Sequence, residues 1–419
     1  MLTGPRCNNP LAEICEPGFR YEAWARTHTE VQPHPDLIQL WKWMTTAELA
    51  QTLEPMAACE PPVKGRSAID SRDVRVLAKS RTVDVYPYTA QARMRINAFK
   101  VPKGEHEARL VLDGRRFDDM LKALEEQGAI RLPPMPPLHI RDTIDTLLAP
   151  SRRIIATVDA KSMFYQFAIH EDLRAYFALS GFENVRFAAL PMGITFAPAW
   201  AQHLSNHLIE VTKARYASAG HAGEWDAVAW IDNYIFATQD AATMERVKTI
   251  FLSLAAEVNL RMKEWTVTNG ASHTLEALGV ALDVRARTAA PAKRSREVIG
   301  EFRRTLGQGG ASMTARTFLT YFGHASFVSY AVLRYPLCLI PGLMREQRRL
   351  ARLRHYDEED VTLSAEDVRE AVAWVDFLSS GRFAMPSAKQ RALAEYSTDA
   401  ELVSALSAFR RSLKGESRE

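Results

Sequence analysis

The 419-residue chain is poor in cysteine, and the few cysteines that it has are scattered. Its four cysteines, Cys7, Cys15, Cys59 and Cys338, form no CxxC pair and have no histidine at the spacing of a zinc ligand. Structural zinc sites and disulfide frameworks both need such groupings. The sequence therefore predicts neither, and a reducing compartment is expected.

The chain also lacks long apolar runs and a strong excess of either charge. No run approaches the roughly 18 to 20 apolar residues that cross a bilayer, and the first residues lack the basic-then-apolar order of a signal peptide. We expect no membrane partner and an intracellular protein, cytoplasmic or nuclear. The formal net charge of +3 excludes a uniformly cationic surface, so a polyanion would have to be held in a groove.

The remaining composition is that of an ordinary globular protein, with 47% hydrophobic and 25% charged residues. The length exceeds that of a usual single core, so two or three packed units are expected. Between residues 153 and 284, the apolar patterns follow the order strand, hairpin, helix, hairpin, helix, strand. This order is typical of an α+β fold, and helical patterns follow it.

Two acids stand at the ends of apolar segments with the composition of strands. Asp159 closes "RRIIATVD", and Asp232 lies inside "VAWIDNYIF", where a hairpin turn is expected. Taken alone, each acid is an ordinary cap or a salt-bridged surface residue. If both strand tips belong to one sheet, the two carboxylates would instead form a site for a hard divalent cation.

Five stretches resemble, in the right order, motifs of reverse transcriptases from retroelements. The stretch "ARLVLDGRRFD" is similar to the family's fingers motif, while "VDAKSMFYQFAIHEDLRAYFAL" and "FAALPMGITFAPAWAQHL" are similar to its first two palm motifs. "AWIDNYIFAT" is similar to the third, aromatic-x-Asp-Asp, and "LEALGVAL" to the primer-grip strand pair. The likeness covers residues 100–339, and the helical texture after the palm resembles LTR or tyrosine-recombinase (DIRS-like) elements.

The resemblance implies, within the α+β class, a right-hand polymerase fold with fingers, palm and a helical thumb. The expected parts are an N-terminal helical extension at 1–95, fingers at 96–152, palm at 153–284, thumb at 285–355 and a C-terminal linker at 356–419. Within that linker, "YSTDAEL" with Asp399 resembles the first strand of an RNase H domain. Too few residues follow to build one, so either truncation from a larger polyprotein or coincidence accounts for it.

The resemblance also implies the activity of an RNA-directed DNA polymerase, which extends a primer on an RNA or DNA template from dNTPs. Two Mg²⁺ or Mn²⁺ ions, about 3.5 to 4 Å apart, serve this kind of phosphoryl transfer. By the same resemblance, Asp159, Asp232 and the backbone of Ala160 are the metal ligands, and Asn233 completes the catalytic set. The expected partners are a primer–template duplex and dNTPs, and the sequence gives no indication of the oligomeric state.

Positions for substrate contacts follow from the same motifs. The expected dNTP contacts are Lys103 and Arg109 of the fingers, the backbone of Lys161, Ser162 and Met163, the steric-gate ring of Phe164, and Met192 and Gly193 of "LPMG". Leu278 and Gly279 are expected to grip the primer. Each of these residues also has an interpretation without function, as an exposed basic side chain, an aromatic residue of the core or a turn residue.

Further basic residues could meet the phosphates of a duplex or belong to a solvated helix face. They are Arg303, Arg304, Arg316, Arg345, Arg348, Arg349, Arg352 and Arg354. Lys263, in "NLRMKEW", lies where the family carries Asn-x-x-Lys, a pattern that this chain does not have. The resemblance would make Lys263 a proton donor to pyrophosphate, but because the pattern is missing we favour its interpretation as a surface lysine.

Asn233 departs from the family pattern, which predicts a second aspartate there. An amide keeps the shape and one acceptor oxygen but loses the charge, so metal affinity should fall. Either Asp159 and Asp232 suffice, as in the similar Gly-Asp-Asn turn of some negative-strand virus polymerases, or the chain is an impaired or domesticated nucleic-acid-binding relative. We favour the first, because the other palm motifs are intact. A third class, a structural helical protein with a chance pattern, predicts no nucleic-acid affinity.

Overall fold

The computed structural model describes residues 7–57, 67–86, 92–137, 139–268, 273–307, 312–333, 340–353, 359–379 and 383–384. Cys59, Cys338, Arg354 and the "YSTDAEL" stretch lie outside these ranges. Among the described residues, no helix is long and apolar enough to cross a membrane.

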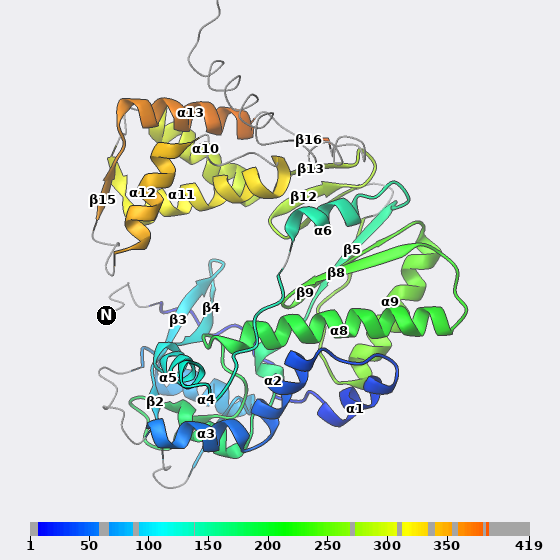
Figure 1. Cartoon of the computed structure of the whole chain (residues 1–419), viewed down its shortest axis with the longest axis vertical. Coiled ribbons are helices and arrows are strands. Elements are labelled where there is room, and N and C mark those ends of the chain that lie inside the picture. Colours follow the sequence, from blue (N-terminus) through cyan, green and yellow to red (C-terminus); the bar gives the residue numbers. More distant parts are fainter. Residues whose placement is uncertain are drawn as a thin grey trace, which may run out of the picture.

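The N-terminal part is mainly helical (blue in Figure 1). It contains α1 (Tyr21–Arg26), the 3-10 helix η1 (Thr27–Thr29), α2 (Pro35–Thr45), α3 (Glu48–Ala57) and α4 (Ser71–Lys79). The start of α4 has a local cause. The Asp70 side chain accepts the amide proton of Asp73, and the Asp73 side chain accepts that of Asp70, which is a capping box.

Short strands and helices follow, next to the N-terminal helices. The strands β3 (Ala98–Lys103) and β4 (Glu107–Leu112) form an antiparallel hairpin, and α5 (Arg115–Glu126) comes after it. A small sheet has the order β1-β7-β6-β2, from β1 (Val83–Val85), β7 (Val185–Phe187), β6 (Ala178–Leu179) and β2 (Arg95–Ile96). The short helices η2 (Met163–Gln166), α7 (Glu171–Arg174) and η3 (Ala175–Phe177) link the two regions of sheet.

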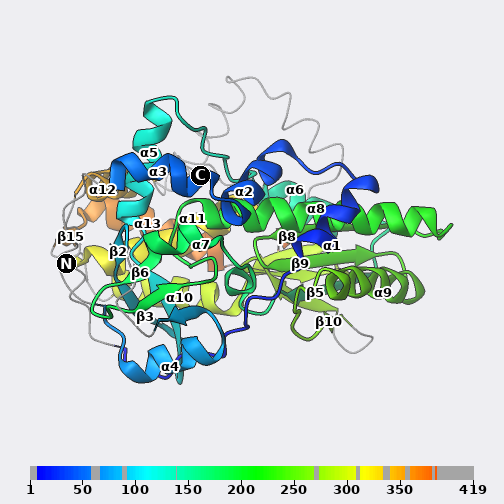
Figure 2. The same cartoon turned by 90° about the horizontal axis from the view of Figure 1, so that it is seen from below.

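An antiparallel sheet of order β10-β5-β9-β8 forms the centre of the molecule. Its strands are β10 (Thr266–Val267), β5 (Ile154–Asp159), β9 (Asn233–Thr238) and β8 (Trp225–Trp230). Two long helices, α8 (Phe196–Ser218) and α9 (Ala241–Glu257), lie along it (green in Figures 1 and 2). The Asp240 side chain caps α9 by accepting the amide proton of Thr243.

The C-terminal part is a second group of helices and a small sheet, at the opposite end of the view from α1–α3 (Figure 1). The helices are α10 (Lys293–Gly307), α11 (Ala315–Val328), the π-helix η4 (Ser329–Leu333), α12 (Pro341–Ala351) and α13 (Ala365–Ser379). The sheet β11-β12-β13-β16 joins β11 (Thr274–Ala277), β12 (Val280–Asp283), β13 (Thr288–Pro291) and β16 (Phe383–Ala384). The short strands β14 (Ser312–Thr314) and β15 (Asp360–Thr362) form a separate antiparallel pair.

The two faces of the central sheet belong to two different hydrophobic cores. Ala156, Val158 and Phe236 face a core shared with the N-terminal part, α8 and α9. Ile155 and Ile235, their alternating neighbours, belong to a second core with α6 (Ile140–Leu147), β11–β13 and α10–α13. This alternation follows from the two-residue period of a strand. The expected mixture of helices and strands is confirmed, and the division into parts stays a prediction.

Candidate active site

The two acids singled out in the sequence lie at neighbouring strand ends of the central sheet. Asp159 is the last residue of β5, and its register partner on β9 is Asn233. Asp232 lies in the two-residue turn between β8 and β9, and its carbonyl accepts the amide proton of Ala160 at 2.7 Å. The backbone next to one acid is therefore hydrogen-bonded to the backbone of the other.

Asp159, Asn233 and Trp230 form one cross-strand row. Trp230 pairs with Asn233 and Asn233 with Asp159, so the three side chains share a face of the sheet. The Trp230 side chain is 39% exposed, although large aromatic residues are usually more buried. This row thus presents a carboxylate, an amide and a flat apolar ring on the same side.

The turn that carries Asp232 has a strained backbone. Ile231 has φ 55°, in the left-handed region, which a β-branched residue adopts only at a cost of about 1–3 kcal/mol. Two side chains of α8 hold it there. Gln202 accepts the Ile231 amide proton at 2.9 Å and donates to the Ala229 carbonyl at 2.9 Å, while the Ser205 hydroxyl donates to the Ile231 carbonyl at 2.6 Å.

Gln202 and Ser205 were not singled out from the sequence. Both are buried in the middle of α8, where apolar residues dominate. The available signal was a glutamine and a serine among the apolar residues of "AWAQHLSNHL", because polar groups on a buried helix face need hydrogen-bond partners. The sequence could not say that the partner was the turn of Asp232.

The electrostatic environment of Asp232 favours its protonated form. Burial raises the pKa of the Asp232 carboxyl, and the negative charge of Asp159 raises it further. The positive charges of Lys263 and Arg109 act in the opposite direction. Two carboxylates that repel each other in a half-buried position would be relieved by a bound cation.

Lys263 lies directly on the first acid. Its Nζ is 2.7 Å from Asp159 Oδ2, and its backbone N–H donates to the Asp159 carbonyl at 2.8 Å. The Lys263 side chain is 49% exposed, so it does reach solvent. Its exposure agrees with the interpretation of Lys263 as a surface lysine, and its ammonium group in addition forms an ion pair with Asp159.

Asn233 is engaged through its side-chain oxygen. The Thr157 hydroxyl donates to Asn233 Oδ1 at 2.9 Å, from the neighbouring position on the same face of β5. The amide oxygen that could have served as a neutral metal ligand therefore already accepts a hydrogen bond.

The turn after Asp159 is tied to other segments. The Lys161 amide donates to the Arg261 carbonyl at 2.8 Å, and the Lys161 ammonium pairs with Glu13 Oε2 at 2.8 Å. Ser162 adopts φ 50°, and its hydroxyl donates to the Glu13 carbonyl at 3.0 Å. Met163 is buried in η2, and Phe164 packs on the first core while staying partly exposed.

The N-terminal segment, which we define as residues 7–20, bridges the β3–β4 hairpin and this turn. Ala12 donates its amide proton to the Ala108 carbonyl at 2.8 Å, and Gly18 donates to the Gln166 carbonyl at 3.0 Å. Glu16 pairs with Arg261 at 2.9 Å. The sequence indicated no role for this segment.

The β3–β4 hairpin carries the two basic residues expected to contact a nucleotide. Lys103 lies at its exposed tip and pairs with Glu107 at 3.2 Å. Arg109 is exposed on β4, and its charge lowers the pKa of Asp232. Arg109 is thus linked electrostatically to the turn that carries Asp232, while Lys103 has a local partner.

The expected "LPMG" loop packs against the end of β4. The Met192 carbonyl accepts the Leu112 amide proton at 2.9 Å. Gly193 has φ 113°, and a Cβ there would lie 2.2 Å from the Leu112 carbonyl oxygen, so only glycine fits. Leu278 and Gly279 form the left-handed turn between β11 and β12, with φ 52° and 77°.

Several of the arginines proposed for phosphate contact have acidic partners. Arg303 pairs with Asp376 at 2.6 Å, and Arg345 lies 3.7 Å from Asp367. Arg349 pairs with Glu346 at 2.7 Å and with Glu359 at 3.3 Å. These three belong, at least in part, to a salt-bridged helix surface, the second of the two interpretations drawn from the sequence.

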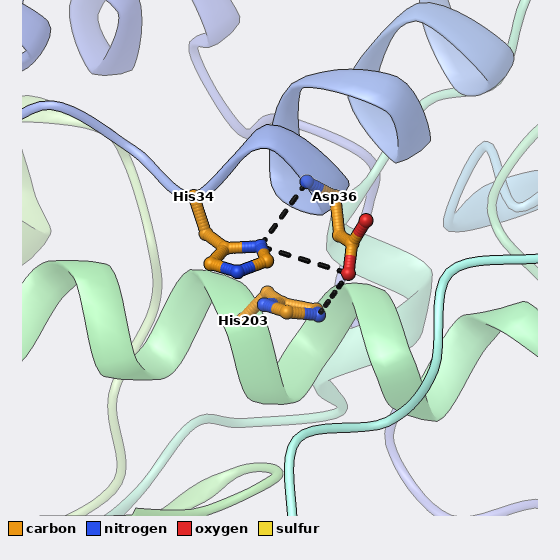
Figure 3. Close-up of side chains that lie close together, drawn as sticks. All are labelled: His34, Asp36 and His203. Carbon is orange, nitrogen blue, oxygen red and sulfur yellow. Dashed lines mark hydrogen bonds and ion pairs between the residues drawn. The ribbon is translucent and has the colours of Figure 1, made fainter.

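A separate cluster, His34, Asp36 and His203, lies where the start of α2 meets α8 (Figure 3). Asp36 Oδ2 is 3.6 Å from His34 Nδ1 and 3.9 Å from His203 Nε2. The two rings are stacked, with centroids 5.0 Å apart and planes 24° apart. Because a ring nitrogen binds a metal in the plane of its ring, two stacked rings do not converge on one ion.

The hydrogen bonds of this cluster also argue against a metal. His203 Nε2 lies 3.1 Å from the Pro134 carbonyl, which can only accept, so that nitrogen carries a proton. His34 Nδ1 accepts the amide proton of Asp36 at 3.2 Å, and Arg131 pairs with the other Asp36 oxygen. These hydrogen bonds and ion pairs account for the cluster as a structural network that anchors α2 on α8.

Comparison with known proteins gives a likeness in fold only. No family model matches the chain, and no curated protein matches its sequence. Three solved structures of the foamy viral protease–reverse transcriptase match 77% of the chain at 13–14% identity. A form in complex with double-stranded DNA gives a TM-score of 0.55, the RNA/DNA hybrid complex 0.53, and another double-stranded DNA complex 0.51.

The match covers 50%, 39% and 60% of those three chains, so this chain corresponds to part of each. The fold is reverse-transcriptase-like, as the sequence motifs predicted. The assignment to an LTR or DIRS-like element stays a prediction.

Proposed function

We propose that this chain is an RNA-directed DNA polymerase that extends a primer on an RNA or DNA template. The single observation that carries the proposal is the meeting of Asp159 and Asp232, which are remote in sequence, through the hydrogen bond between Ala160 and Asp232. The likeness to reverse transcriptases in complex with double-stranded DNA and with an RNA/DNA hybrid supports a duplex as the partner.

The proposed layout follows the right-hand arrangement. The β3–β4 hairpin and its surroundings would act as fingers, the central sheet with α8 and α9 as palm, and α10–α12 as thumb. Trp230, exposed beside Asn233, offers a flat apolar surface to a nucleoside at the primer end. Leu278 and Gly279 would contact the primer strand from the β11–β12 turn.

The residues present fit a pair of divalent cations in their chemistry. Asp159 and Asp232 are hard oxygen donors. Burial and the negative charge of Asp159 raise the pKa of Asp232, and a cation would offset both effects. Asp159, Asp232 and the Ala160 backbone would hold the ions. Mg²⁺ or Mn²⁺, when bound, supplies activation of the primer hydroxyl and charge neutralisation at the leaving pyrophosphate.

The remaining side chains position the substrate. Arg109 can bind the nucleotide's phosphate oxygens in a bidentate manner, because its fork matches phosphate geometry. The Phe164 ring, partly exposed after the Asp159 turn, would lie under the sugar and exclude a 2′-hydroxyl. Lys161 would become available to a triphosphate only if its ion pair with Glu13 opens.

Primer extension by the purified chain tests the proposal. We expect incorporation of dNTPs on an RNA template with Mg²⁺ or Mn²⁺. Asp159→Ala and Asp232→Ala should abolish extension while leaving duplex binding within about twofold, since neither removes a basic residue. Asp119→Ala, an exposed acid on α5, is the matched control and should extend normally.

The second candidate is a catalytically impaired nucleic-acid-binding relative. Two observations favour it. The Lys263 ammonium group forms an ion pair with the Asp159 carboxylate. Asn233 is uncharged where the motif has an aspartate, and its side-chain oxygen accepts a hydrogen bond from the Thr157 hydroxyl. This candidate predicts binding of a duplex with no extension in either metal. Binding without extension would therefore overturn the polymerase proposal and retain this one.

A further inference from the structure

The ion pair between Lys263 and Asp159 bears on how the candidate site takes up a cation. Lys263 Nζ lies 2.7 Å from Asp159 Oδ2, the distance of a direct charge-assisted hydrogen bond. Two positive groups act on the Asp232 carboxyl: Lys263, from the chain between α9 and β10, and Arg109, from β4. Asn233, their neighbour in the sheet, contributes no charge.

The backbone holds Lys263 at this position. Its amide proton is donated to the Asp159 carbonyl at 2.8 Å, and Ala160 and Met262 form an antiparallel bridge beside it. The ammonium group therefore starts from a fixed point opposite Asp159 and needs only its flexible side chain to reach the carboxylate. Its 49% exposure leaves it a path away from the acid toward solvent.

A divalent cation and the ammonium group cannot share the Asp159 carboxylate without cost. Mg²⁺ ligand oxygens lie about 2.0–2.1 Å from the ion, so both cations would be within a few ångströms of each other. Their repulsion is not offset by a third acid, because residue 233 is an amide. The two cations therefore weaken each other's hold on this carboxylate, which makes their binding competitive.

We propose that Lys263 is an internal counter-cation that competes with the divalent metal for Asp159 and sets the metal concentration at which the site fills. This rests on the assignment of Asp159 as a metal ligand in the proposed function. Lys263 is a positioning residue in this scheme: it neutralises Asp159 when the metal is absent and swings toward solvent when the metal binds. The absence of a charge at Asn233 makes the competition more effective.

Binding of Mn²⁺ to the full chain, followed by the EPR signal of free Mn²⁺ without nucleotide or nucleic acid, tests this. We expect Lys263→Gln to bind Mn²⁺ about three- to tenfold more tightly than the unmodified chain. Lys263→Arg keeps the cation and should stay within about twofold of it. Thermal unfolding of each variant checks that it is folded.

Lys213→Gln is the matched control for charge. Lys213, on α8, is also half-buried, but its ammonium pairs with Glu210 at 3.1 Å and with Asp226 at 3.2 Å, and Asp226 lies at the end of β8 opposite the β8–β9 turn. Its removal should change Mn²⁺ affinity by less than about twofold. Asp159→Asn should weaken Mn²⁺ binding. Adding Lys263→Gln to it should not increase the Mn²⁺ affinity, because the carboxylate for which the two cations compete is no longer present.

An equal or weaker Mn²⁺ affinity of Lys263→Gln would overturn the inference, as would a gain of the same size in Lys213→Gln or no Mn²⁺ binding by any variant. Primer extension separates this result from the proposed function. Extension with unchanged Mn²⁺ affinity in Lys263→Gln would reject the competition alone. Tighter Mn²⁺ binding without extension would retain the competition and reject the polymerase.

Discussion

Gln202 on α8 accepts the amide proton of Ile231 at 2.9 Å and so fixes the left-handed residue beside Asp232. We expect Gln202→Ala to leave that buried amide without a partner, which costs about 1–3 kcal/mol of stability. Because the strained turn would relax, primer extension should fall more than duplex binding. Urea unfolding and single-turnover extension measure the two effects.

Asn206→Ala is the control for Gln202. Asn206 lies one turn later on the same helix, is exposed, and touches Gln202 at 2.9 Å without reaching the turn. Its loss should change stability by less than about 0.5 kcal/mol. Equal effects of the two substitutions would contradict the assigned role of Gln202.

Gly193→Ala tests the close approach of the "LPMG" loop to β4. A Cβ would lie 2.2 Å from the Leu112 carbonyl oxygen, and φ 113° is unfavourable for any side chain. We expect a loss of about 2–4 kcal/mol in urea unfolding. Gly104→Ala, at φ 67° with nothing within 4 Å of the added carbon, should cost only about 1 kcal/mol.

Asn233→Asp restores the charge that the motif lacks. The new carboxylate can still accept the Thr157 hydroxyl hydrogen bond, so the fold should be unaffected. We expect the Mn²⁺ concentration for half-maximal extension to fall, by about tenfold, because a third negative charge faces the ions. An unchanged requirement would indicate that position 233 lies outside the reach of the metals.

Phe164→Ala tests the ring as a steric gate. Removing it should let ribonucleotides be incorporated about tenfold more readily relative to deoxyribonucleotides, since the space for a 2′-hydroxyl opens. The measurement is the ratio of rNTP to dNTP incorporation in single-nucleotide extension. A ratio equal to that of the unmodified chain would leave Phe164 as a packing residue.

Stability should fall as the pH drops below 6.5, through the buried His207. Burial and the neighbouring His28 lower the pKa of His207 from 6.5 to about 4, while Glu30 opposes them. A histidine with a depressed folded pKa must be charged in the unfolded chain first, so stability is lost between pH 6.5 and about 4.

At pH 5.0 this loss amounts to about 2 kcal/mol relative to pH 7.5. His207→Gln keeps a donor for the Thr27 hydroxyl and should flatten that part of the curve. Urea unfolding at both pH values gives the comparison. An equal pH dependence in the variant would assign the effect to other groups.

The central strands and helices could be predicted because their signals are local. "RRIIATVD" ends at Asp159, as β5 does, and the apolar period of α8 and α9 spans whole helices. The two acids stood out because each interrupts an apolar run. Motif order then predicted that the two acids belong to one site, and the structure brings their backbones into hydrogen-bond contact.

The contacts missed by the sequence are the long-range ones. Lys263 and Asp159 are 104 positions apart, and the N-terminal segment contacts Ala108 and Gln166 across similarly long stretches of chain. The hydrophobic periodicity of a sequence does not predict which strand edge or carboxylate a distant residue will contact. The left-handed Ile231 was equally hidden, since a β-branched residue argues against that conformation until its buried partners are known.

The division of the central sheet between two cores limits how the chain can be cut. A fragment ending before β11 would keep the N-terminal core intact and leave α6 as the remaining cover of Ile155, Ile235 and Ala237. Newly exposed aliphatic surface of this kind drives self-association. The sheet that carries the two acids therefore depends on the C-terminal part of the chain for its solubility.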